Sequence, residues 1–272
     1  MRKDGKKAGD TGLQIGARAH VAGSGAAPGS SAVVPRLLPA GDGALVIELG
    51  EAIAPEINAR VHALDAAIGR AGIRCISETV PTYRSILVYF DALAADAGSL
   101  SERLLALAAE DHSRDETTAR RWHIPVAYGG THGIDLEDVA KATGLSTAEV
   151  VALHAAADYA VYMIGFSPGF AYLGGLAEAL HLPRRTNPRL KTPAGSVMVG
   201  GMQAAISPLA MPSGWHILGT TPARLFEPAA AEPFLLRPGD RVRFQPVSVA
   251  DFERLSQAAR HAGWRPDHDA LT

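Results

Sequence analysis

The sequence predicts an α+β N-terminal domain followed by a mainly β domain. Residues 41–109 alternate short apolar runs with amphipathic segments, the pattern of a mixed α/β unit. After Asp158, glycine and proline recur every few residues up to Pro246 with only short apolar runs between them, which is typical of a β-barrel or sandwich. The length of 272 residues fits one large or two small domains.

Composition excludes several classes of function. Hydrophobic residues make up 47% and charged residues 20% of the chain, as in a folded globular protein. The net charge of −2 leaves no broad basic surface for nucleic acid, and no run of 18 apolar residues suits a membrane helix. Cys75 is the only cysteine, and the ten histidines lack the spacing of a metal site. We therefore expect a cytoplasmic protein without a metal ion, a nucleic-acid partner or a membrane anchor.

Residues 1–38 are predicted to form a flexible leader. Four basic residues near Met1 precede a stretch at 22–31 that consists entirely of glycine, alanine, serine and proline. Such a composition buries too little apolar surface to offset the entropy of ordering. No apolar segment of signal-peptide type follows the basic start, so a leader is favoured over a targeting signal.

The N-terminal domain is placed at residues 39–112. Its predicted elements, in order, are a strand at 44–49, a helix at 55–71, strands at 73–80 and 85–90, and a helix at 99–107. Pro55 suits a first helical residue and Gly72 suits the residue that follows a helix. Ser99 with Glu102 has the spacing of a capping box. This β-α-β-β-α order predicts a ferredoxin-like, two-layer α/β domain, and residues 122–128 are either its last strand or the first strand of the next domain.

The second domain is placed at residues 113–250, and residues 251–272 are expected to form a C-terminal helix and a polar tail. Two short helices are predicted at 135–142 and 146–156, the second opened by a capping box of Ser146 and Glu149. The remainder is predicted to be short strands joined by turns.

Several motifs in the second domain resemble one family. They are GFSPGFAYLG at 165–174, LPRRTNPR at 182–189, PAGSV at 193–197 and GWHILG at 214–219, with weaker matches at 41–42, 81–85 and 124–129. The chain resembles the family that includes the B subunit of bacterial 5-oxoprolinase, allophanate hydrolase subunit 1 and the sporulation kinase inhibitor KipI (carboxyltransferase domain, subdomains C and D). The resemblance covers about residues 40–250. It implies that the second domain is a cyclophilin-like β-barrel.

The resemblance implies a subunit of an ATP-dependent 5-oxoprolinase complex, which hydrolyses 5-oxo-L-proline to L-glutamate. It implies ATP with Mg²⁺ as the cofactor of the complex, a partner of the C-subunit or subunit-2 type, and a LamB/YcsF-type subunit. One alternative is a KipI-like inhibitor that binds a sensor histidine kinase. Another is a subunit related to allophanate hydrolase or urea carboxylase; its biotin would have to come from another chain, because neither Lys141 nor Lys191 has a biotinyl-lysine context.

Candidate substrate-binding residues fall in these motifs. Aromatic side chains at even spacing share one face of an extended chain, and arginines in a proline-bounded loop suit a carboxylate or a phosphate. Packing in the core and a solvated loop are the respective alternatives. The predicted substrate-binding residues are Phe166, Pro168, Gly169, Phe170, Tyr172, Arg184, Arg185, Arg189, Ser196, Gln203 and Trp215.

No catalytic residue is assigned from spacing; Ser167 and His216 are the candidates. Residues 165–169 satisfy G-x-S-x-G, the nucleophile elbow of α/β-hydrolases. In that elbow the residue after the serine donates its backbone N–H to the oxyanion, and Pro168 has no N–H. His216 follows Trp215 in a predicted strand and suits a pocket position. We therefore expect Ser167 to serve a turn or a substrate hydrogen bond.

Overall fold

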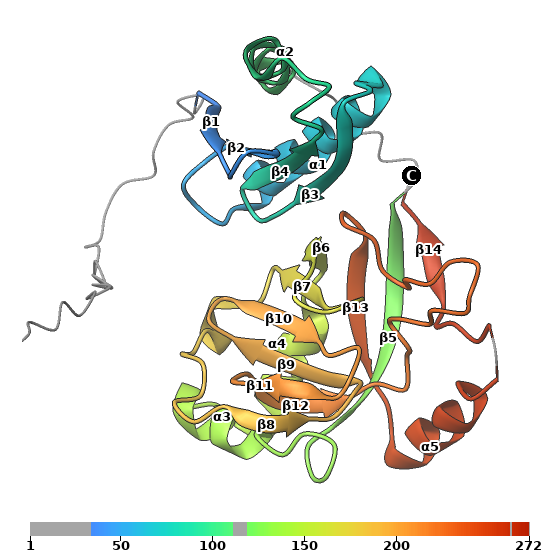
Figure 1. The fold of residues 1–272 in the computed structure, drawn as a ribbon. Helices are drawn as coiled ribbons and strands as arrows, with labels where there is room; N and C mark the ends of the chain where they lie inside the picture. The colour runs from blue at the N-terminus through green and yellow to red at the C-terminus, as the bar shows by residue number, and fades with distance from the viewer. Residues whose placement is uncertain (1–33, 111–118, 262, 272) are drawn as a thin grey trace, which may run out of the picture. The chain divides into compact units, whose positions relative to one another are not determined.

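The computed structural model describes residues 34–110, 119–261 and 263–271 (Figure 1). Most of the predicted leader, 1–38, and the predicted domain boundary at 112 lie outside the described residues. The last residues of the predicted leader belong to the fold, because Arg36–Pro39 form strand β1, paired with β2. The folded domain therefore begins earlier than the sequence indicated.

The first sheet is antiparallel and has the strand order β1-β2-β4-β3. Its strands are β1 (Arg36–Pro39), β2 (Ala44–Glu48), β3 (Ile76–Pro81) and β4 (Ser85–Phe90). The position next to β2 is filled by β1, which precedes it in the chain, and not by a strand following the second helix. The predicted β-α-β-β-α order is present, with β1 added ahead of it, and the two helices and the sheet form a two-layer α/β domain. The strand at 120–128 pairs in the second sheet, so of the two alternatives for 122–128 the structure has the one in which it opens the next domain.

Two helices cover one face of this sheet. Helix α1 (Pro55–Ala71) begins with proline and ends at Gly72 in the left-handed conformation, as the sequence predicted. Helix α2 (Ala97–Ala109) begins earlier than predicted, because the Asp96 carboxylate, and not Ser99, caps it by accepting from the Ser99 N–H. Leucine, isoleucine and valine side chains of both helices and of strands β2 and β4 form one core.

The second domain contains a closed ring of seven strands in the order β12-β9-β10-β7-β6-β13-β5, with β5 paired to β12 to close it. Its strands are β5 (Arg120–Tyr128), β6 (Tyr159–Ile164), β7 (Ala171–Gly174), β9 (Ser196–Gly200), β10 (Gln203–Ile206), β12 (His216–Thr220) and β13 (Arg241–Pro246). A separate two-stranded sheet joins β8 (Arg189–Thr192) to β11 (Met211–Ser213). The predicted β-barrel is thus present.

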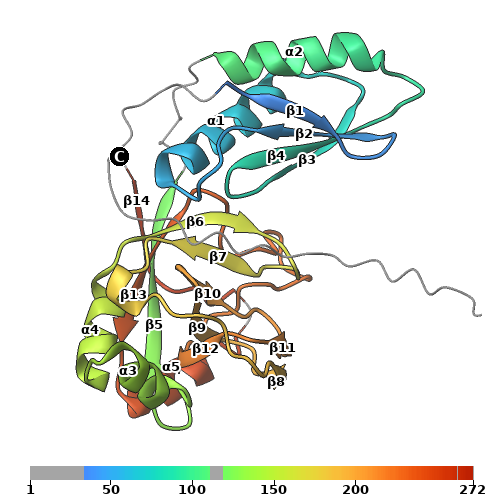
Figure 2. The same ribbon diagram turned by 90° about the vertical axis from the view of Figure 1, so that its left-hand side faces the viewer.

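Helices α3 (Leu136–Thr143) and α4 (Thr147–Ala156) lie side by side against the barrel (Figure 2), near the short 3₁₀ helix η2 (Glu178–Leu180). The predicted capping box of Ser146 and Glu149 opens α4. The C-terminal region has the expected helix, but the expected polar tail contains a further strand. It forms helix α5 (Val249–Ala258) and then strand β14 (His268–Ala270), which pairs with β5.

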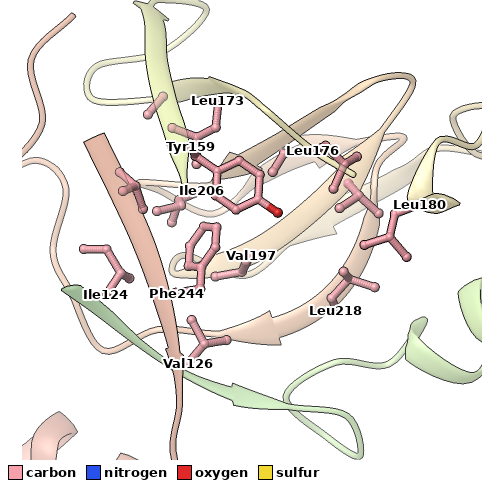
Figure 3. Close-up of a cluster of buried hydrophobic side chains, with 14 of the residues drawn as sticks. Ile124, Val126, Tyr159, Leu173, Leu176, Leu180, Val197, Ile206, Leu218 and Phe244 are labelled. Carbon is pink, nitrogen blue, oxygen red and sulfur yellow. The ribbon is translucent and has the colours of Figure 1, made fainter. Parts of the chain in front are cut away.

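Apolar side chains fill the interior of the barrel (Figure 3). Tyr159, Phe244 and Leu218 point inward from three strands and are almost completely buried. His154 on α4 is fully buried among them, its Nδ1 2.8 Å from the Tyr128 hydroxyl. Because side chains occupy this space, the predicted binding residues must act from outside the ring. No helix in the described ranges is both long and apolar enough to cross a membrane.

Candidate functional site on the outer face of the barrel

The loop between β6 and β7 contains a tight turn at residues 167–170, which explains its proline and glycine. The Phe170 N–H donates to the Ser167 carbonyl at 3.0 Å, and Gly169 has a φ of 79°. Glycine at the third position supplies the positive φ that a type II turn needs, and proline is common at the second position. A Cβ on Gly169 would also lie 3.1 Å from the Leu225 carbonyl oxygen. Pro168 and Gly169 are therefore explained by backbone conformation.

Phe166, at the start of this loop, holds an unfavourable conformation. It has a φ of 69°, the only positive φ outside glycine among the described residues. Its side chain is 74% exposed and meets Phe170 edge-on, with ring centroids 5.7 Å apart. Backbone strain of this kind persists only where the surrounding structure enforces it.

Ser167 and His216 do not form a nucleophile–base pair. Ser167 lies in a loop between two strands, and its buried Oγ has no hydrogen-bond partner. His216 Nε2 lies 3.0 Å from the Pro183 carbonyl oxygen, while its buried Nδ1 has no partner. An elbow serine needs a strand–turn–helix setting and a base within hydrogen-bond reach, and Ser167 has neither.

Aromatic and apolar side chains gather on the outer face of the barrel. Alternation along β7, β9, β10 and β12 sends every second residue inward to the core and the others outward. We call the outward group the outer-face cluster; its members are Phe170, Tyr172, Met198, Ala205, Met211, Trp215 and Ile217. Phe170 and Tyr172 have ring centroids 4.8 Å apart, and Tyr172 and Trp215 6.2 Å. Phe170 and Tyr172, predicted from their even spacing to share a face, therefore lie on this face together with Trp215, whereas Phe166 is not a member of the cluster.

A glycine makes room for the indole of Trp215. A Cβ on Gly200 would lie 3.0 to 3.3 Å from three atoms of that ring. Such contacts are too close for an unchanged packing, so the missing side chain lets Trp215 lie against β9. Trp215 is only 5% exposed, so most of its indole is packed within the outer-face cluster.

The three loop arginines have different partners. Arg185 donates to the Asp135 carboxylate at 3.0 Å, and Arg189 donates to the same oxygen. The other Asp135 oxygen accepts from the Ile217 N–H at 2.8 Å, and Asp135 is 1% exposed. A buried carboxylate must be paired in this way, so Arg185 and Arg189 fasten the loop to β12.

Arg184 is the loop arginine that remains available. Its guanidinium carbon lies 5.1 Å from the centroid of the Trp215 ring. It has no acidic partner among the described residues, and the residue is exposed. Of the three predicted anion-binding arginines, the geometry leaves this one free to receive a carboxylate, and stacking on an aromatic face orients it.

Gln203 and Tyr83 add polar groups beside the cluster. The Tyr83 hydroxyl donates to Gln203 Oε1 at 3.0 Å, and the Tyr83 and Tyr172 rings meet edge-on at 5.7 Å. Gln203 is 7% exposed, and its Nε2 has no partner. A buried amide N–H without an acceptor is costly, so this group is suited to a ligand carbonyl.

Burial disfavours ionisation of both phenols. It raises the pKa of Tyr83 to about 12, against the opposing effects of the Gln203 hydrogen bond and the Arg184 charge. Burial likewise raises the pKa of Tyr172, with Arg184 again opposing. Near neutral pH the two hydroxyls are therefore neutral donors, and Arg184 supplies the positive charge of the site.

The structure also bears on the predicted substrate-binding role of Ser196 and on metal binding. Ser196 is 1% exposed and donates to the Pro193 carbonyl at 2.8 Å, a contact within its own turn and not toward the outer-face cluster. Among the described residues, no group of three or more His, Cys, Asp or Glu side chains has the arrangement of a metal site.

Comparison with known proteins decides the family. Residues 35–236 match the family described as carboxyltransferase domain, subdomain C and D. The chain belongs to this family. Its curated relatives include the B subunit of 5-oxoprolinase from Bacillus subtilis (39% identity, 80% of this chain and 95% of that protein) and from Escherichia coli O157:H7 (44%, 76% and 93%).

Two solved structures that match this fold belong to longer chains. This carboxyltransferase-domain chain matches the crystal structure of TTHA0988 with a TM-score of 0.68 at 39% identity; the match covers 75% of this chain and 40% of that one. The Kluyveromyces lactis urea amidolyase matches with a TM-score of 0.71 at 21% identity, covering 86% and 16% of the two chains, which shows a shared fold.

Three residues of the site were missed by sequence reasoning. Tyr83 lay in a recognised motif, but its position between two predicted strands indicated only a turn. Asp135 was placed at the start of a helix, and Gly200 was taken as one glycine among many. Each gains its role from a partner distant in the chain, 120 positions away for Tyr83 and Gln203.

Proposed function

We propose that this chain is a subunit of an ATP-dependent 5-oxoprolinase complex, which opens 5-oxo-L-proline to L-glutamate. The support is the pair of relatives named as the B subunit of 5-oxoprolinase, each matched over more than nine-tenths of its length. The partners in this proposal are a subunit of the C or 2 type and a LamB/YcsF-type subunit. The similarity to urea amidolyase, at 21% identity, bears on fold and not on substrate.

The observation that carries the assignment of the site is the unpaired Arg184 stacked on Trp215. The substrate is a small ring with one carboxylate and one amide carbonyl. We assign the carboxylate to the Arg184 guanidinium and the flat ring to the half-buried Tyr172 beside Trp215. The unpartnered Gln203 Nε2 then donates to the amide carbonyl. These groups orient the substrate and fix its polarity without performing a covalent step themselves.

ATP would supply the free energy for opening the lactam ring, whose carbonyl carbon takes up water as its C–N bond breaks. A triphosphate requires several cationic or backbone donors. The outer-face cluster offers one unpaired arginine, so it does not fit ATP, and no step of the proposal passes through ATP bound there.

The test is reconstitution with the partner subunits, followed by measurement of glutamate released from 5-oxoproline with and without ATP. The proposal expects ATP-dependent glutamate formation that requires this chain. Allophanate and urea serve as competing substrates, and inhibition of a histidine kinase tests the KipI-like alternative. A correctly assembled complex that releases no glutamate would overturn the proposal.

A further inference from the structure

A second concentration of charge lies away from the outer-face cluster, around Glu232. Its carboxylate is 3.1 Å from Arg237, 3.2 Å from Arg265 and 4.0 Å from Arg120. Arg265 also donates to the Glu232 backbone carbonyl at 2.8 Å. We call these four residues the Glu232 cluster. Three guanidinium groups therefore converge on one side chain.

Two cavities adjoin this cluster and share Glu232. The larger, of about 800 Å³, is lined by Arg224, Arg260 and Arg265 and by the loop at 226–232. The smaller, of about 350 Å³, is lined by Arg237 and by apolar residues that include Phe234. The larger one exceeds the volume of a phosphate group and is in the range of small-molecule sites.

Positive charge exceeds negative charge here. The larger cavity has Glu227 bonded to Arg224 at 3.0 Å, while Arg260 has no acidic partner among the described residues. The Asp240 carboxylate is 2% exposed and already accepts hydrogen bonds from the Arg120 guanidinium, the Trp122 indole N–H and the Arg237 backbone N–H. Five arginines thus face three carboxylates, and the excess is positive.

Glu232 has the geometry of a stand-in for an anionic ligand. Guanidinium groups bind carboxylate and phosphate oxygens by the same paired hydrogen bonds. The Glu232 side chain is 52% exposed, so it returns to water at low cost when another anion displaces it. The buried Asp240, by contrast, is fixed by its partners.

We propose that the Glu232 cluster and the larger cavity bind the phosphate group of a small molecule, with the Glu232 carboxylate as the internal competitor. This site is independent of the assignment of Arg184, since the two share no residue. A nucleotide and free phosphate offer the same anionic oxygens, so the cluster recognises both. The volume of the larger cavity limits the size of the group attached to the phosphate.

The test is a calorimetric titration of the intact chain, without partner subunits, using inorganic phosphate, pyrophosphate and ATP in turn. Glu232→Gln removes the competitor and should tighten phosphate binding about five-fold. Glu253→Gln makes the same charge change on exposed α5 and should have no effect. Arg237→Gln and Arg265→Gln should each weaken binding about five-fold, and Arg254→Gln, whose partner is Asp251, should not.

The outcomes separate the sources of the anion. Tighter binding of ATP than of phosphate indicates a nucleotide, and equal binding indicates that the phosphate group alone is recognised. Absence of binding by all three probes up to about 10 mM would overturn the proposal. So would equal affinities in Glu232→Gln and Glu253→Gln, or unaltered binding in the two arginine variants with unchanged thermal unfolding. Because affinity is measured without turnover, failure here leaves the proposed 5-oxoprolinase function untouched.

Discussion

The guanidinium of Arg184 lies over the indole of Trp215, while the adjacent Arg185 is bonded to the buried Asp135. Two consecutive arginines thus have opposite tasks. Arg185 holds the loop in place, and Arg184 presents its charge at the surface of the outer-face cluster. This division gives the loop variants distinguishable effects.

Arg184→Lys should lower kcat/KM of the reconstituted complex about ten- to a hundred-fold, equivalent to about 1.5–3 kcal/mol for a charge-assisted contact. Lysine keeps the charge but loses the planar fork and the stacking. Thermal unfolding should not change. Arg254→Lys, at an exposed site on α5, is the matched control, and an Arg184→Lys variant with full activity would remove this residue from the site.

Asp135→Asn should destabilise the protein by about 3–5 kcal/mol, because it leaves two arginines near a neutral, poorly accepting side chain. Urea unfolding monitored by circular dichroism measures the loss. Asp138→Asn, an exposed residue of the same helix, should change stability by less than about 1 kcal/mol. Similar values for the two variants would show that Asp135 does not fasten the arginine loop.

Ser167→Ala should leave hydrolytic activity of the assembled enzyme within about two-fold, since the serine contributes its backbone carbonyl to the turn and Pro168 offers no oxyanion donor. Gly169→Ala should instead destabilise the loop, through its positive φ and its approach to Leu225. Treatment with a fluorophosphonate followed by mass spectrometry provides the decisive measurement: an adduct on Ser167 would restore the hydrolase interpretation.

Folding stability should fall as the pH drops below about 6.5. Burial lowers the pKa of His154 to about 3 in the folded state, whereas the unfolded chain takes up the proton near 6.5. Between these values the unfolded state binds more protons than the folded state, so each unit by which the pH falls lowers the free energy of unfolding by at most about 1.4 kcal/mol. The free energy of unfolding of His154→Gln should depend less steeply on pH in this window. His181→Gln, at an exposed histidine, should keep the slope of the parent; equal slopes in all three proteins would refute the assignment.

Deleting residues 1–38 should lower Tm by a few degrees relative to a chain that begins at Val34. The longer deletion removes most of β1, including Leu37, which packs against the core of the first domain. The expected loss is about 1–2 kcal/mol. Scanning calorimetry of the two truncated chains provides the comparison, and identical transitions would mean that β1 is dispensable.

Local signals in the sequence predicted most of the elements. Pro55 and Gly72 marked the ends of α1 because their backbone preferences act at single positions. The cap of α2 was misplaced because Asp96 and Ser99 are both good capping residues, and only the backbone shows which one precedes the helix. Strand β1 was missed because four residues with little burial carry no strong periodic signal.

The site was predictable only in part. The aromatic residues and the arginines lay in dense motifs, so they were predicted as substrate-binding residues from the sequence. Their partners were not, because Asp135 meets Arg185 and Tyr83 meets Gln203 through strand register and long-range packing. No spacing rule links positions that the fold alone brings together.

The closure of the barrel has a consequence for the order in which the protein forms during its synthesis. The four strands of the first sheet all lie between residues 36 and 90, so that sheet can be complete early in translation. Strand β5 must wait for its parallel neighbour β13, since Arg121 pairs with Arg241. Contacts so distant in the chain form slowly. The incomplete barrel therefore keeps the β13-facing edge of β5 unpaired on the ribosome until β13 is synthesised, when only about the last tenth of the chain is still to be made.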